Sequence, residues 1–168
     1  MSEKLNDPIL WYALTDMEQC KCIATLVMGW ERRHEVRTTQ SSTRGCRRTD
    51  IYYWHVPEDQ VPRLHNYIDT GEWDLDCDAW NPMLDPRAWT AVINRIRTLV
   101  VYPKIEMDVR KSGYWFVNIW GDGKDELSDV ILPVNAYSKQ IGEAVCIAVL
   151  RVLGYEVISE EMPVDTDA

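Results

Sequence analysis

The sequence lacks any long run of apolar residues. No stretch approaches the roughly 18 consecutive apolar residues that a membrane-spanning helix requires. The first eight residues contain no basic segment followed by an apolar one, which argues against a secretion signal. The five cysteines, an odd number, fit a reducing compartment better than a framework of disulfides. We therefore expect a cytoplasmic protein that has no contact with a membrane.

The recognisable motifs of catalysis and metal binding are also missing. There is no Gly-x-Ser-x-Gly nucleophile motif and no glycine-rich loop that leads into a helix. The three histidines are scattered, and the cysteines lack the paired spacing of a zinc site. Asp74, Asp76 and Asp78 have part of the spacing of a calcium loop, but Ala79 stands where that loop requires glycine. We predict that the protein is not an enzyme and uses no metal or cofactor.

What the sequence does contain is the composition of one globular domain. Its 168 residues are 46% apolar and 27% charged, which favours a single hydrophobic core. There are eight Trp and eight Tyr but one Phe. Trp and Tyr carry a polar group on an apolar ring and suit half-buried positions and interfaces. We predict a single domain over residues 1–158 with surfaces suited to binding, and a loose acidic tail over residues 159–168.

The charges are unevenly distributed along the chain. The net charge of −9 argues against general nucleic-acid binding, which depends on a basic face. Six arginines and one acid lie between Arg32 and Arg48, whereas eight acids and one basic residue lie between Glu58 and Asp85. These two stretches are either solvated surface or two patches that complement a partner.

Three helices are predicted from their caps and periodicity. Thr15 and Glu18 have the spacing of a capping box, which predicts a helix over residues 15–28. Asp85, followed by proline, predicts the start of a second helix. Residues 138–153 are apolar on almost every side, which is typical of a buried helix.

Segments rich in β-branched and aromatic residues predict strands between these helices. The expected strands cover residues 30–37, 51–56, 105–109, 114–120 and 128–132, with a hairpin loop at 121–124. Residues 38–50 are expected to form a mobile polar loop within a longer irregular, insertion-like region, 38–80, which includes a short helix at 61–68. The order of elements predicts an α+β fold, a layered α/β/α sandwich with about four to five antiparallel strands and three main helices.

Three short segments resemble a family of small phage proteins. Residues 27–30 read Val-Met-Gly-Trp, residues 80–92 read Trp-Asn-Pro-Met-Leu-Asp-Pro-Arg-Ala-Trp-Thr-Ala-Val, and residues 142–150 read Gly-Glu-Ala-Val-Cys-Ile-Ala-Val-Leu. They are similar to motifs of the phage α/β/α ("ABA") sandwich family, although Met83 and Leu84 stand where that family has Ser-Thr. The resemblance implies the sandwich fold and a phage or prophage origin, and hence the cytoplasm of a bacterial host.

The resemblance implies no general biochemical activity, so the function is predicted from the surface. Our first hypothesis is an inhibitor of a bacterial defence or host complex, as anti-CRISPR proteins are. It would bind a host protein or a protein–nucleic-acid complex through acidic and aromatic side chains rather than bind nucleic acid directly. The residues expected at that interface are Asp69, Glu72, Trp73, Asp74, Asp76 and Asp78.

A second hypothesis concerns the basic stretch, residues 32–48. Arginine forks match phosphate groups, and aromatic rings stack on bases. The chain would then be a sponge that binds a nucleotide signal or another phosphate ligand. The residues expected to bind that ligand are Arg44, Arg47, Arg48 and Tyr53. The sequence leaves two further alternatives open: that the chain is an enzyme of unfamiliar geometry, and that it forms a symmetric homodimer.

Overall fold

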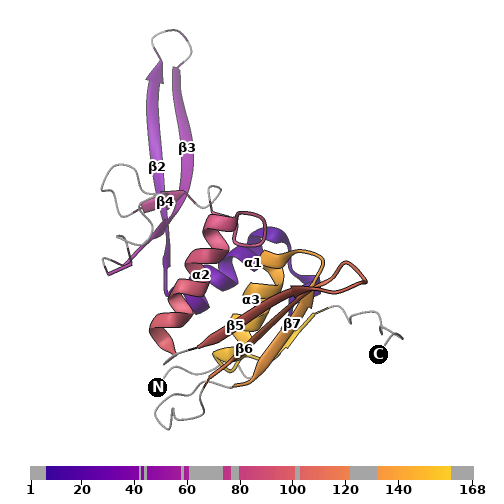
Figure 1. Ribbon diagram of the computed structural model, residues 1–168. Coiled ribbons are helices and arrows are strands. Elements are labelled where there is room, and N and C mark those ends of the chain that lie inside the picture. The colour runs from indigo at the N-terminus through magenta and orange to yellow at the C-terminus, as the bar shows by residue number, and fades with distance from the viewer. Residues whose placement is uncertain are drawn as a thin grey trace. The chain divides into compact units, whose positions relative to one another are not determined.

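The computed structural model (Figure 1) describes residues 7–41, 43, 45–57, 59–60, 74–76, 80–100, 103–121 and 132–159. Within these residues the fold is mixed α+β, so the α+β part of the prediction is confirmed, whereas the layered sandwich stays a prediction. The chain divides into two compact units, which the composition did not predict. Unit 1 comprises residues 1–28 and 81–168, and unit 2 comprises residues 29–80. None of the described helices is long and apolar enough to cross a membrane.

The first helix of unit 1 begins at the predicted cap. Helix α1 spans Asp16–Cys22 and is continued by a π-helical segment, Ile23–Val27. The Thr15 hydroxyl accepts the backbone N–H of Glu18 at 3.3 Å, and the Glu18 carboxylate accepts the backbone N–H of Thr15 at 2.8 Å. This reciprocal pair is the capping box that the sequence predicts, and it satisfies two donors that the helix itself leaves free.

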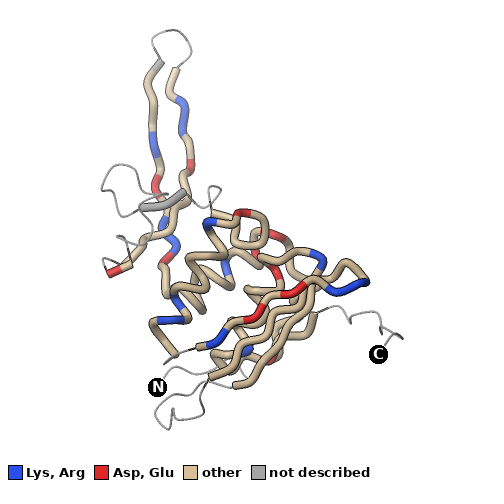
Figure 2. The backbone as a smooth tube through the Cα atoms, viewed as in Figure 1, with Lys and Arg blue, Asp and Glu red and all other residues tan. Residues whose placement is uncertain are grey.

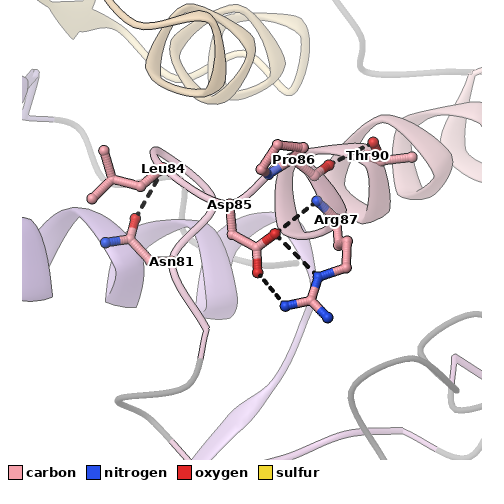
Figure 3. Close-up of polar contacts among 6 residues, drawn as sticks. All are labelled: Asn81, Leu84, Asp85, Pro86, Arg87 and Thr90. Carbon is pink, nitrogen blue, oxygen red and sulfur yellow. Dashed lines mark hydrogen bonds and ion pairs between the residues drawn. The ribbon is translucent and has the colours of Figure 1, made fainter.

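The second helix also begins as predicted. Helix α2 spans Pro86–Leu99, and Asp85 caps it by accepting the backbone N–H of Arg87 at 2.9 Å (Figure 3). The Arg87 guanidinium donates to both oxygens of the same carboxylate. The side-chain oxygen of Asn81 accepts the backbone N–H groups of Met83 and Leu84, which fixes the turn before the helix.

The third helix is the centre of unit 1. Helix α3 spans Ile141–Val152, and nine of its twelve residues are buried. It packs against α2 and against the strands at residues 115–120 and 134–138. Gly142 lies so close to the backbone carbonyls of Pro82 and Met83 that a Cβ atom there would overlap them. The helix begins three residues later than expected, because Ser138 ends a strand.

Two small sheets complete the described part of unit 1. Strands β5 (Lys104–Val109), β6 (Trp115–Trp120) and β7 (Val134–Ser138) form an antiparallel sheet in that order. Strand β1 (Ile9–Leu10) pairs in parallel with β8 (Val157–Ile158), and a 3₁₀ turn, Trp11–Ala13, follows β1. The strand predicted at 128–132 and the loop at 121–124 lie almost wholly outside the described residues.

Unit 2 is built on a long hairpin. Strands β2 (Glu31–Ser41) and β3 (Gly45–His55) are antiparallel and pair along their whole length, and β4 (Asp74–Asp76) pairs with β3. The prediction of a loop over residues 38–50 is therefore wrong, and the irregular region predicted over 38–80 contains regular strands. Gly45 has a φ of 79°, which glycine adopts without strain, so β3 can begin there. The polar side chains alternate between the two faces of the hairpin. The backbone hydrogen bonds between its strands form without an apolar face.

The hairpin starts from a group of buried tryptophans. The rings of Trp30 and Trp80 have centroids 4.7 Å apart, and the Trp30 indole N–H donates to Gln60 at 2.8 Å. Trp54 and Val56 are buried as well. These three tryptophans therefore serve the packing of unit 2 itself, at the end of the hairpin away from the turn.

Candidate functional site

The outer part of the hairpin is exposed on both faces. Every described side chain of β2 up to Gln40 is exposed, and so is every residue of β3 from Gly45 to Asp50. We call residues 36–50 the bare ribbon. A two-stranded hairpin with no packed face is marginal by itself in water. Such a ribbon contributes nothing to a core, which favours a role in binding.

The pairing register distributes the basic side chains over both faces of the bare ribbon. Residues that pair across two strands share a face. Arg48 pairs with Thr38, whereas Arg47 pairs with Thr39, so the two arginines point to opposite faces. Figure 2 shows basic residues placed along both strands of the hairpin. A partner that surrounds the ribbon would meet positive charge from either side.

The arginines of the hairpin differ in their partners. Arg33 forms an ion pair with Glu31 at 3.2 Å, and Arg37 forms one with Glu35 at 3.5 Å. All four side chains are exposed, so these pairs contribute at most about 1 kcal/mol each. Arg47 and Arg48 form no ion pair with any residue that the structure describes. Their charges are available to a ligand.

One face of the hairpin also carries a stack of rings. The Arg32 guanidinium lies 4.5 Å from the centroid of the Tyr52 ring, and the His34 ring lies 4.7 Å from the same centroid at 22°. His34 Nε2 is 2.9 Å from Asp50 Oδ1. Tyr52 remains 44% exposed. The stack holds the ring in place and leaves part of it for contact with a ligand.

The structure places the residues predicted to bind a phosphate ligand on β3. Arg47 and Arg48 lie on the bare ribbon, and Tyr53 is half-buried opposite Arg33. Arg44 lies outside the described residues. Arg47, Arg48 and Tyr53 therefore lie on one strand. Tyr53 is six residues from Arg47 and on the same face of the hairpin, but it lies nearer the buried end of the hairpin.

The residues predicted to bind a protein partner are described only in part. Asp74 and Asp76 lie on β4, where they pair with His55 and Tyr53. The other four residues of that set, Asp69, Glu72, Trp73 and Asp78, lie outside the described residues. The acidic and basic stretches are separate in the sequence, but the register places Asp76 beside Tyr53 in one sheet.

Unit 1 contains a cavity that the sequence analysis missed. Its volume is about 410 Å³, and it lies among the 3₁₀ turn, the start of α1, the turn after Asn81, and the start of α3. Its aromatic walls are Trp11, Tyr12, Tyr114 and Tyr137. Its charged residues are Asp16, Lys139 and Glu143.

Glu143 connects three elements at this cavity. Its Oε1 accepts the indole N–H of Trp11 at 2.8 Å, and its Oε2 accepts the Ser138 hydroxyl. The Ser138 oxygen in turn accepts the backbone N–H of Gln140 at 3.1 Å. Glu143 lies in the first turn of α3, where the helix dipole favours a negative charge. These bonds fix the position of the Glu143 carboxylate at the cavity.

A cation already lies over one of the aromatic walls. Lys139 Nζ is 5.8 Å from the centroid of the Tyr114 ring. That separation is within the range of a cation–π interaction. The face of Tyr114 can therefore accept a positive charge at this cavity.

No local pattern in the sequence predicts the cavity. Trp11 and Glu143 are 132 residues apart, and each has a commonplace interpretation on its own, a core aromatic residue and an acid at a helix start. Only the packing of α3 brings them together. Among the described residues, no group of three or more His, Cys, Asp or Glu side chains is arranged to hold a metal ion.

Comparisons with known proteins add no relative. No protein-family model matches the chain, and neither a curated protein nor a solved structure matches it at a significant level. The resemblance to the phage α/β/α sandwich family stays a prediction.

Proposed function

We propose that this chain is a non-enzymatic binding protein that holds a nucleic acid through the bare ribbon. The observation that supports this proposal is the exposure of residues 36–40, 43 and 45–50, with Arg47 and Arg48 on opposite faces of the ribbon. It develops the second hypothesis of the sequence analysis, in which the basic stretch binds phosphate.

The dimensions and composition of the ribbon suit a phosphate backbone. Within the ribbon each strand has six residues, 36–41 and 45–50, and extends over about 20 Å, long enough to reach more than one phosphate. A two-stranded ribbon fits the major groove of a DNA duplex. Besides the arginines, the ribbon offers threonine and glutamine side chains at positions 38–40, which commonly contact phosphate and sugar oxygens.

The net charge of −9 bears on the partner as well. The composition argues against nucleic-acid binding because the chain as a whole is acidic. The hairpin, residues 31–55, nevertheless contains six arginines against three acids. Attraction would then be local to the ribbon, and added salt should weaken it steeply.

Fluorescence anisotropy with a labelled 30-base-pair DNA duplex and a labelled single-stranded RNA, at two salt concentrations, tests the proposal. The double variant Arg47→Gln, Arg48→Gln should bind on the order of tenfold more weakly, and its salt slope should fall by about two because two phosphate contacts are lost. The matched control is Arg97→Gln, Lys111→Gln, which removes two exposed charges from unit 1. Absence of binding by the unaltered protein, or equal losses in both variants, would contradict the proposal.

A second candidate function is the inhibitor of a bacterial defence or host complex. One observation favours it: β4 is the last strand in the described order β2–β3–β4, and a strand from a partner protein would add to this sheet beside β4. Strand β4 carries Asp74 and Asp76. Charge reversal, Asp74→Lys with Asp76→Lys, should release a partner captured from a bacterial lysate. Undiminished capture by that variant would exclude the acidic edge as the interface.

We also infer the finer fold and origin from the resemblance. The proposal is that the β5–β6–β7 sheet, with α2 and α3, belongs to a layered α/β/α sandwich of the phage family. The packing of α3 against β6 and β7 supports one helical layer on this sheet. A phage or prophage protein of this kind would act in the cytoplasm of its bacterial host.

A further inference from the structure

We propose that the cavity of unit 1 binds a small organic cation, an amine carried on an apolar or aromatic body. The proposal is independent of the ribbon, because it rests on Glu143 and Asp16 placed among the tyrosine rings of another unit.

The size and walls of the cavity suit such a molecule. A volume of about 410 Å³ is within the range of small-molecule sites in proteins. Tyr12, Tyr114 and Tyr137 offer ring surface for an apolar body. Their hydroxyls and the amide side chains of Gln19 and Gln140 add polar groups that fix orientation.

The charges select a cation rather than an anion. Glu143 keeps acceptor capacity after its two bonds to Trp11 and Ser138, because each carboxylate oxygen has two lone pairs. Asp16 adds a second carboxylate from a different element. An anionic ligand would face both of these negative charges, whereas an ammonium group would be attracted by them.

Lys139 indicates where the ammonium group would lie. Its own ammonium is 5.8 Å from the centroid of the Tyr114 ring, so a cation over a tyrosine face already occurs at this cavity. Lys139 is exposed and can be displaced at little cost. It would compete with a cationic ligand for the same ring and repel it, so its removal should strengthen binding.

Two probes of similar shape and opposite charge test the proposal: phenethylammonium and 3-phenylpropionate. Each is titrated into the full chain while the indole N–H resonances of its eight tryptophans are followed by NMR. The Trp11 resonance, assigned with Trp11→Phe, reports on the cavity because that N–H donates to Glu143. Phenethylammonium should shift it saturably, and 3-phenylpropionate should not.

Charge variants give changes of opposite sign. Glu143→Gln should weaken phenethylammonium binding on the order of tenfold, because an ionic contact is replaced by a neutral one. Lys139→Gln should strengthen it severalfold. Asp16→Asn is a second way to remove a carboxylate if Glu143→Gln fails to fold, and Glu106→Gln on the exposed side of β5 is the control that should change nothing.

Several outcomes would overturn the proposal. The first is a Trp11 resonance that neither probe shifts at a concentration on the order of 10 mM, which would detect even weak binding. The second is an equal response to the two probes. The third is a Lys139→Gln variant that binds phenethylammonium more weakly. The Arg47→Gln, Arg48→Gln variant should bind phenethylammonium normally, so failure of the ribbon and failure of the cavity are distinguishable.

Discussion

The cysteines of this chain lie in different environments, because Cys20 and Cys146 are buried whereas Cys46 is exposed. Burial, and then the negative charge of Asp16, raises the pKa of the Cys20 thiol to about 11. Burial also raises the pKa of Cys146 well above its ordinary value. Cys46 is exposed on the bare ribbon. Since the thiolate is the reactive form, these residues should differ widely in reactivity.

Alkylation of the native protein with iodoacetamide at about pH 8 tests this difference. At that pH only about one in a thousand Cys20 thiols is ionised if its pKa is about 11, and burial limits access to Cys20 and Cys146 alike. Peptide mass spectrometry should find Cys46 modified first and these two protected until the chain is unfolded in guanidinium. Equal rates at Cys20 and Cys46 in the native protein would show that the Cys20 environment is not as described.

At the scale of elements, local sequence signals were sufficient to predict the helices but insufficient to predict the hairpin. The caps at Thr15 and Asp85 act within three residues of the helix start, so the sequence alone locates them. The strands over 38–50 have no apolar alternation, and their polar residues read as a loop. Their hydrogen bonds come from a partner strand, which no local pattern reveals.

Shortening the hairpin separates its role in binding from its role in stability. Replacing residues 37–49 by Asn-Gly joins Val36 to Asp50, which pair across the strands, through a two-residue turn. Because every removed side chain that the structure describes is exposed, the melting temperature should change by no more than about 4 °C, roughly 1 kcal/mol, as measured by circular dichroism. Nucleic-acid binding should be lost. Retained binding would exclude the ribbon as its site, and a much lower melting temperature would show that the ribbon supports the fold.

At the scale of the whole molecule, the chain divides its properties between two units. Unit 1 contains the buried helix α3 and the cavity, and unit 2 contains the hairpin with its arginines. The net charge of −9 does not describe the charge around the hairpin or around the cavity, because salt screens the interaction between charges more than about 10 Å apart. The two proposed sites can therefore bind ligands of opposite charge.

The sequence by itself determined the α+β class, the starts of α1 and α2, and the burial of α3. These follow from interactions within one or two turns and from the spacing of apolar residues. Only the tertiary structure decided that residues 38–50 are paired strands and that Trp11, Ser138 and Glu143 meet at one cavity. Strand pairing and cavity walls depend on contacts between residues distant in the chain, and a linear pattern does not specify which distant residues will meet.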